Sequence, residues 1–174
     1  MSPDDLAVIE LSSFQLEIMT RSVWVAAVLN ITPNHLDRHG TMEAYHSAKA
    51  RLITQQSADG CAVLGRDDPG AWSLAGEVRG RLFSFGMDRP PAGMRGAYLD
   101  GEVVSVWDGQ ATQAVLPRRN ILLRGEHNLQ NVLAACAVAD AAGLPVEAMR
   151  AAVEGFRGVP HRLEWVRTWN GAAW

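Results

Sequence analysis

Short runs of uninterrupted apolar residues mark the first third of the chain. Leu6–Leu11 (LAVIEL) and Trp24–Ile31 (WVAAVLNI) do not alternate with polar residues, which is typical of strands buried on both faces of a parallel sheet. Between them, Ser12–Arg21 is long enough for a short helical crossover. Cys61–Leu64 (CAVL) predicts a third strand, which the turn-forming sequence GRDDPG ends. This part of the sequence therefore predicts a buried parallel sheet.

From Thr41 to about Gln56 the apolar positions change to a helical spacing. Thr41 is a candidate N-cap for this helix. Residues three or four positions apart gather on one face of the predicted helix: Met42, Tyr45, Lys49, Leu52 and Ile53. We therefore expect this face, with the lysine included, to be directed toward the core.

The middle of the chain contains shorter strand-like pieces. They are Arg81–Phe85, Gly96–Leu99, Val103–Trp107 and Gln113–Leu116. Asp-Gly pairs at Asp100-Gly101 and Asp108-Gly109 predict two hairpin turns. We expect these pieces to form a small antiparallel layer attached to the parallel sheet.

Helical patterns return toward the end of the chain. Asn128–Ala142 is followed by Gly143, and Pro145–Phe156 begins with a residue suited to a first helical turn. The final residues, HRLEWVRTWNGAAW, predict a strand, a turn at Asn170-Gly171 and the start of another strand. The predicted fold class is α/β, with a mostly parallel sheet flanked by helices plus a small antiparallel sheet.

Composition narrows the class of protein. A chain of 174 residues with 48% hydrophobic and 20% charged residues is typical of one globular domain. The net charge of -3 gives no sign of a nucleic-acid partner, and apolar runs such as Val23–Leu29 are too short to span a membrane. The first residues lack the basic region of a signal peptide, and Cys61 and Cys136 in apolar contexts favour free thiols over a disulfide. These features predict a cytoplasmic protein.

Three residues are candidates for chemistry at one edge of the predicted sheet. Glu10 ends the first predicted strand, His35 follows the second, and Lys49 lies on the helix after it. Ligands of open α/β sheets bind at the carboxyl ends of the parallel strands, so these side chains are expected to converge there. Each also has an ordinary interpretation: an exposed carboxylate, a turn histidine bonded to backbone, and a lysine whose ammonium reaches water.

Lys49 stands out because it is the only lysine beside fifteen arginines. A desolvated lysine can lose its proton, whereas arginine stays charged. A neutral amine takes up carbon dioxide as a carbamate, which is an anionic oxygen ligand of the kind that Mg²⁺ binds. The sequence therefore favours Lys49 as a reactive residue.

Four blocks of sequence, in order, resemble the Mur ligases. They are ELSSFQLE (Glu10–Glu17), LNITPNHLDRHGTMEAYHSAK (Leu29–Lys49), LRGEHNLQNVLAACAVADAAGLP (Leu123–Pro145) and FRGVPHRLE (Phe156–Glu164). The first block is most similar to the branch that joins D-glutamate to UDP-N-acetylmuramoyl-L-alanine in peptidoglycan synthesis. The resemblance implies a central domain that binds ATP and Mg²⁺ in a ligase that works through an acyl phosphate.

The resemblance also implies roles for individual residues. Glu10 and His35 match metal-site positions, and Lys49 matches a lysine that is carbamylated and supports a second Mg²⁺. His35 and Lys49 are therefore the expected catalytic residues, with Glu10 completing the metal set.

Substrate positions are implied in the same way. Ser12 and Gln15 match positions near the nucleotide-sugar substrate, Asn128 and Asn131 match a helix start that contacts adenine, and Arg162 matches an arginine near the ATP phosphates. From the residues alone, N-capping and solvent contact are the favoured explanation for the asparagines. A surface ion pair explains the arginine equally well.

The family pattern is incomplete in this sequence. The Mur ligases have a glycine-rich phosphate loop ending in Gly-Lys, whereas the only lysine here follows Ala48. We therefore expect residues 1–160 to be a central ATPase-type domain without this loop and 161–174 to start a C-terminal domain. The isolated chain is expected to be inactive and to self-associate. Alternatives are an inactive module with weak nucleotide or Mg²⁺ binding, and a piece of another Mur or folylpolyglutamate-type ligase.

Overall fold

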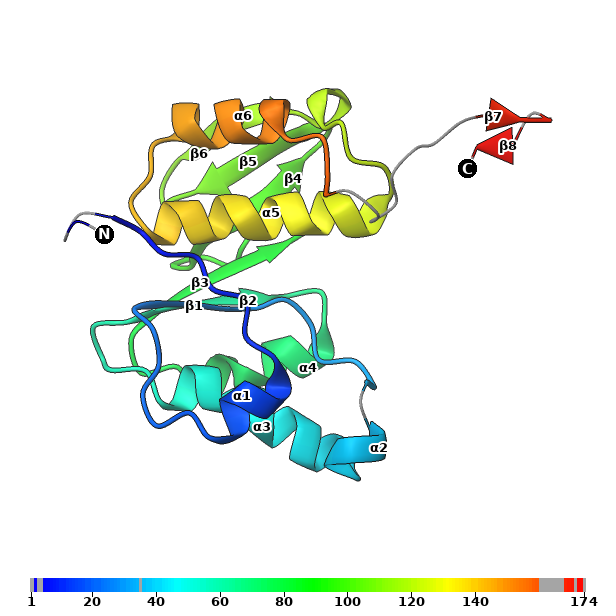
Figure 1. Cartoon of the computed structure of the whole chain (residues 1–174). Helices are drawn as coiled ribbons and strands as arrows, with labels where there is room; N and C mark the ends of the chain where they lie inside the picture. The colour runs from blue at the N-terminus through cyan, green and yellow to red at the C-terminus, as the bar shows by residue number, and fades with distance from the viewer. Residues whose placement is uncertain (1, 3–4, 35, 160–167, 171, 174) are drawn as a thin grey trace.

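The computed structural model describes residues 2, 5–34, 36–159, 168–170 and 172–173. Its centre is one six-stranded sheet in which the strands follow one another in sequence order (Figure 1). The strands are β1 (Val25–Val28), β2 (Cys61–Gly65), β3 (Arg81–Gly86), β4 (Arg95–Asp100), β5 (Val103–Trp107) and β6 (Thr112–Pro117). The predicted α/β fold class is confirmed.

The sheet changes direction at β4. Strands β1 to β4 are parallel, whereas β4, β5 and β6 pair antiparallel. The two Asp-Gly turns lie where they were predicted, at the β4–β5 and β5–β6 connections. The antiparallel strands extend the same sheet, and the predicted strand at Arg81–Phe85 belongs to its parallel part, because Cys61 pairs with Arg81 in parallel register.

Helices cover both faces of the sheet (Figure 1). One face carries α1 (Ser13–Glu17), α2 (Leu36–His39), α3 (Met42–Thr54), α4 (Pro69–Trp72) and the 3₁₀ helix η1 (Ser73–Glu77). The other carries α5 (Glu126–Ala141) and α6 (Val146–Gly155), which follow the short 3₁₀ helix η2 (Arg118–Asn120). No helix in the described ranges is long and apolar enough to cross a membrane.

The core is divided by the sheet into two apolar clusters. Cys61 and Val63 of β2 belong to the cluster under α5, whereas Ala62 and Leu64 belong to the cluster under α3 and α4. All five residues of β2 are buried. Burial on both faces explains why the strand appears in the sequence as a continuous apolar run.

Local signals correctly placed the helix ends. Thr41 caps α3 by accepting a hydrogen bond from the Ala44 amide at 3.1 Å. Helix α5 ends shortly before Gly143, whose φ of 79° lies in the left-handed region that favours glycine. Helix α6 is Val146–Gly155, so the two predicted end residues, Pro145 and Phe156, are its caps instead of its first and last helical residues.

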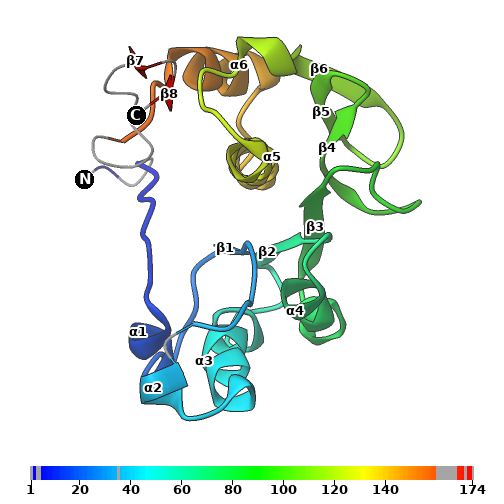
Figure 2. The ribbon, with the colours of Figure 1, turned by 90° about the vertical axis from the view of Figure 1, so that its right-hand side faces the viewer.

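The prediction of a buried strand at Leu6–Leu11 is wrong. The segment has no strand structure, and Leu6, Val8 and Ile9 are 59%, 95% and 64% exposed. Figure 2 shows it as an extended stretch that leads to α1 and stands apart from the sheet. An apolar run indicates a tendency to be buried, but a strand also needs a neighbouring backbone with which to pair. In the described part of the chain this segment has no ladder partner.

The end of the chain contains a two-stranded antiparallel pair. Strands β7 (Thr168–Trp169) and β8 (Ala172–Ala173) flank a turn in which Asn170 has a φ of 49°. The predicted strand–turn–strand pattern is confirmed over these residues, whereas HRLEWVR before them lies outside the described residues.

Candidate functional site

The carboxyl ends of the parallel strands bring together segments that are distant in sequence. Strand β1 leads into Asn30 and Ile31, and β2 leads into Arg66, Asp67 and Asp68. Because β1 and β2 are parallel neighbours, these two loops leave the same edge of the sheet. This edge is the place where ligands of open α/β sheets bind.

Lys49 reaches this edge from helix α3. Its Nζ donates a hydrogen bond to the Asn30 carbonyl oxygen at 3.3 Å and lies 5.3 Å from the centroid of the Tyr45 ring. The side chain is half-buried, whereas Tyr45 and Ile53, which the sequence places on the same face of the helix, are buried. The prediction that Lys49 lies near the carboxyl edge is confirmed, although it sits at the border of the core.

Asp68 links the ends of β1 and β2. Its Oδ1 accepts hydrogen bonds from the Ala71 amide at 2.7 Å, as the N-cap of α4, and from the Ile31 amide at 3.0 Å. A single carboxylate oxygen therefore starts a helix and holds the loop that follows β1. This fixes the backbone next to the Asn30 carbonyl that contacts Lys49.

Asp67 links the same edge to β3 and α5. Its Oδ2 accepts hydrogen bonds from the Met87 amide at 2.8 Å and from Gln130 Nε2 at 3.3 Å. The approach is so close that a Cβ at Gly86 would lie 2.6 Å from Asp67 Oδ1, which explains the glycine. From the sequence, GRDDPG predicts only a turn, because Asp and Gly are typical of turns whatever else their side chains contact.

Arg66 spans the ends of β2 and β3. Its guanidinium donates to Ser84 Oγ at 2.8 Å and to the Asp88 carbonyl oxygen. Burial lowers the pKa of Arg66, while the charges of Asp67 and Asp88 act in the opposite direction. An arginine nevertheless stays charged in proteins, so a fixed positive charge lies beside the Asp67 carboxylate.

The other two predicted metal-site residues are Glu10 and His35. Glu10 is exposed in the extended segment before α1, and His35 lies outside the described residues. No group of three or more His, Cys, Asp and Glu side chains within the described ranges is arranged to hold a metal ion. The predicted convergence of Glu10, His35 and Lys49 therefore stays a prediction.

Ser12 and Gln15 lie together at the start of α1. The Ser12 amide donates to Gln15 Oε1 at 2.8 Å, and the Gln15 amide donates to Ser12 Oγ at 3.4 Å. This reciprocal arrangement is a capping box. Both side chains are exposed, so the pair presents polar groups to solvent.

Asn128 and Asn131 lie on the outer face of α5. Asn128 Nδ2 donates to the Arg124 carbonyl oxygen at 2.7 Å, and Asn131 Nδ2 lies 3.4 Å from Asn128 Oδ1. The N-cap of α5 is Gly125, so neither asparagine is an N-cap. Asn131 is exposed and Asn128 is half-buried, whereas Leu129 between them is buried. Arg162, the remaining predicted nucleotide contact, lies outside the described residues.

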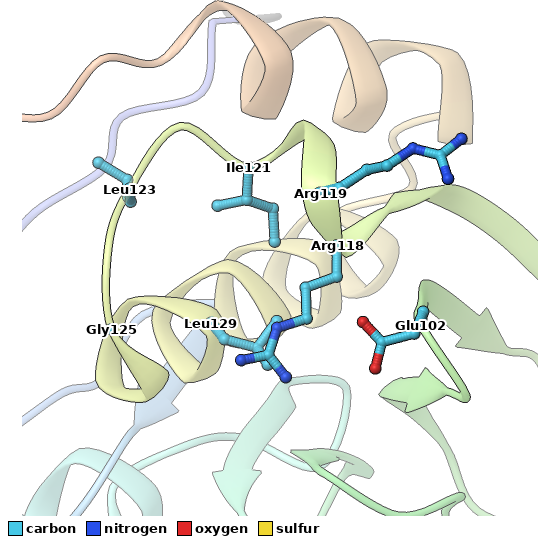
Figure 3. A pocket seen from close by; sticks show the side chains of 7 residues that line it. All are labelled: Glu102, Arg118, Arg119, Ile121, Leu123, Gly125 and Leu129. Carbon is cyan, nitrogen blue, oxygen red and sulfur yellow. The ribbon is translucent and has the colours of Figure 1, made fainter.

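A cavity of about 280 Å³ lies beside the start of α5, away from the site residues that the sequence predicts. It is lined by Glu102, Arg118, Arg119, Ile121, Leu123, Gly125 and Leu129 (Figure 3). Arg118 forms an ion pair with Glu126. None of the residues that the sequence singled out lines this cavity.

A second feature that the sequence did not reveal is the surroundings of His39. Its Nε2 lies 2.9 Å from Ser13 Oγ, and its Nδ1 lies 2.9 Å from Glu17 Oε1. Ser13 and Glu17 are one helical turn apart in ELSSFQLE, which is the only local sign that they share a partner.

Comparison with known proteins places this geometry in a family. The profile of the Mur ligase middle domain matches residues 2–139. The chain is similar to the UDP-N-acetylmuramoylalanine–D-glutamate ligase of Acidobacterium capsulatum, with 42% identity over 173 residues, and to that of Symbiobacterium thermophilum, with 41% over 169 residues. These matches cover 98% and 97% of this chain but only 37% of each relative.

Solved structures support the same fold. The MurF protein of Acinetobacter baumannii superposes with a TM-score of 0.68 at 23% identity, over 90% of this chain and 34% of that protein. A pseudomurein peptide ligase type C from Methanothermus fervidus gives a TM-score of 0.60 at 18% identity, over 83% of this chain and 36% of that one.

The double role of Asp68 leads to a stability prediction. Replacing Asp68 with alanine leaves the Ile31 and Ala71 amides without their partner, so the free energy of unfolding should fall by about 1–3 kcal/mol. Urea denaturation followed by circular dichroism measures the change. Asp68→Asn is the matched control, because its amide oxygen still accepts both bonds and should restore most of the loss. An alanine variant as stable as the native chain would contradict this role.

Proposed function

This chain belongs to the Mur ligase family, and we propose that it serves an ATP-dependent ligase that joins D-glutamate to UDP-N-acetylmuramoyl-L-alanine during peptidoglycan synthesis. Support for the substrate comes from the D-glutamate ligases that match it at about 40% identity. The chain spans 37% of the length of those relatives, so the activity belongs to the whole protein. Synthesis of this cytoplasmic precursor agrees with a cytoplasmic location.

The proposed reaction forms one amide bond in two steps. A carboxylate oxygen of UDP-N-acetylmuramoyl-L-alanine attacks the γ-phosphorus of ATP, ADP leaves with the electrons of the broken P–O bond, and an acyl phosphate forms. The amine nitrogen of D-glutamate then attacks the carbonyl carbon, the C–N bond forms, phosphate leaves with the C–O bond electrons, and the nitrogen loses a proton. In phosphoryl transfer most of the catalytic effect comes from positioning and charge stabilisation. The residues at the carboxyl edge are therefore expected to hold the reacting groups and to orient them.

The observation that carries the proposal is the position of Lys49. It lies beside the end of β1, with its nitrogen 3.3 Å from the Asn30 carbonyl oxygen. We propose that the Lys49 ammonium loses a proton and that its nitrogen then attacks carbon dioxide: an N–C bond forms, the nitrogen releases a second proton, and a carbamate anion with two oxygens replaces the cationic group. Arginine has no equivalent chemistry at neutral pH.

Mg²⁺ fits these donors by their chemistry. The Glu10 carboxylate is exposed, and a carbamate on Lys49 adds anionic oxygen at the sheet edge; both are ligands that Mg²⁺ prefers. We propose that Glu10, His35 and the modified Lys49 hold the metal, which when bound neutralises charge on the phosphoryl group.

The remaining contacts follow the same proposal. Asn128 and Asn131 present amides on the outer face of α5, where they are able to hydrogen-bond an adenine edge. Ser12 and Gln15 are assigned to the nucleotide-sugar substrate, and Arg162 to the ATP phosphates. Residues 1–160 are assigned to the central domain and 161–174 to the start of the next.

A chimeric enzyme tests this function. This chain replaces the matching segment of the Acidobacterium capsulatum ligase, and phosphate release is measured with ATP, UDP-N-acetylmuramoyl-L-alanine and D-glutamate. We expect D-glutamate-dependent turnover, which Lys49→Arg should lower by at least about 10- to 100-fold because a metal-site group is lost. His46→Gln on the same helix is the matched control and should keep full activity.

The outcomes separate the alternatives. The 174-residue chain alone, which contains no Gly-Lys pair, should show no turnover. A folded chimera that stays inactive with D-glutamate contradicts the proposal. Turnover with another amino acid instead assigns the chain to a different ligase of this family.

We also propose that the isolated chain self-associates. Strand β1 is at the end of the sheet, and Leu6, Val8 and Ile9 are exposed in the extended segment before α1. Unpaired strand edges and exposed apolar residues both favour association. Light scattering after size-exclusion chromatography should give a mass above that of the 18.9 kDa monomer. A monodisperse monomer with a cooperative, high melting transition would contradict this expectation.

A further inference from the structure

The imidazole of His39, on α2, is enclosed by side chains from α1 and α3. Its side chain is only 1% exposed. One nitrogen lies 2.9 Å from Ser13 Oγ and the other lies 2.9 Å from Glu17 Oε1, and both partners are on α1. The ring stacks on Phe14 with centroids 5.0 Å apart and an angle of 5° between the planes, and Tyr45 of α3 lies 5.2 Å away.

The hydrogen bonds define one arrangement of protons for the neutral ring. An ionised Glu17 carboxylate only accepts, so Nδ1 carries the hydrogen that it receives. The lone pair on Nε2 then accepts the hydrogen of the Ser13 hydroxyl. The tautomer of His39 is thus set by Glu17, and the orientation of the Ser13 hydroxyl is set by His39.

A serine, a histidine and a carboxylate in this order also occur in nucleophilic enzymes. Here, however, Ser13 is 7% exposed, and Phe14 covers the face of the imidazole. A nucleophile has to meet its substrate, whereas a structural lock gains from burial because its hydrogen bonds are shielded from water. The geometry therefore favours a structural role, in which the hydrogen bonds of His39 to Ser13 and Glu17 hold α2 against α1. We call these contacts the lock.

The lock joins two segments that carry proposed site residues. Ser13 and Glu17 lie on α1, on which Ser12 and Gln15 form the exposed capping pair. His39 is the last residue of α2, which begins immediately after His35. His39 thus holds the helix proposed to contact the nucleotide-sugar substrate against the helix that follows a proposed metal ligand.

A second contact restrains the other end of α1. Arg51 of α3 donates from Nε to the Leu16 carbonyl oxygen at 3.1 Å and from Nη2 to the Met19 carbonyl oxygen. Arg51 lies two residues after Lys49 on the same helix. Helix α1 has only five residues and makes few hydrogen bonds of its own, so its position depends on these neighbours.

We infer that His39 is a positioning residue, which acts through Ser13 and Glu17 to fix the Ser12–Gln15 pair relative to the segment that contains His35. The roles of Ser12, Gln15 and His35 rest on the proposed function. The lock itself rests only on the contacts described above, so it is measurable on the chain without any ligase activity.

Amide hydrogen exchange of the ¹⁵N-labelled 174-residue chain tests the lock. His39→Phe keeps a ring to stack on Phe14 but removes both hydrogen bonds. Exchange at the Gln15 and Leu16 amides should become about 10-fold faster or more, whereas exchange in β2 should stay the same. His46→Phe is the matched control, because it breaks a similar bond of 2.8 Å to Ser73 elsewhere and should leave α1 unchanged.

Two milder variants and a spectroscopic signal complete the test. Glu17→Gln keeps an acceptor for Nδ1–H and should retain most of the protection, whereas Ser13→Ala loses one bond and should give an intermediate rate. Ring ¹⁵N shifts of native His39 should show hydrogen on Nδ1. Unchanged exchange at Gln15 and Leu16 in both His39→Phe and Ser13→Ala would overturn the inference, as would equal acceleration at every amide or hydrogen on Nε2 only.

Discussion

Complete burial of β2, the parallel strand between β1 and β3, is the constraint on which the rest of this structure depends. Every residue of β2 is buried, and the strand packs against α5 on one face and against α3 and α4 on the other. A strand in this position has no surface on which to carry a reactive group, because an unpaired polar side chain there would lose its hydration. Polar chemistry is therefore concentrated where the strands end.

The carboxyl edge is organised by residues that link one strand end to another. Asp68 binds the amides of Ile31 and Ala71, and Asp67 binds the amide of Met87 and the side chain of Gln130. In this way α5, which carries the proposed adenine contacts, is tied to the loops next to Lys49. The hydrogen bonds of His39 to Ser13 and Glu17 likewise tie α1 to α2. The proposed ligase site thus consists of exposed groups on a backbone that side-chain hydrogen bonds hold in place.

Features with a local signal were predictable from the sequence. Thr41 as a cap, the helix end before Gly143, and the two Asp-Gly turns each depend on a few neighbouring residues, and the structure confirms them. Features that depend on residues distant in the sequence were not predictable. Leu6–Leu11 has the composition of a strand without a backbone to pair with, and Asp67 and His39 gain their roles from residues 63 and 26 positions away in the sequence. The order of apolar runs did not reveal that β3 is parallel to β2, because pairing direction is set by the connections and packing.

The proposed ligase site depends most on the single lysine, Lys49, which lies at the carboxyl edge of the sheet and which we propose forms a carbamate. A ¹³C NMR spectrum of the native chain in ¹³C-labelled bicarbonate tests it most directly, since the chain has one lysine and Lys49→Arg removes it. We predict a carbamate carbon signal in the native chain that is lost in Lys49→Arg. A native spectrum without that signal, or one in which the signal persists in the variant, would contradict the claim.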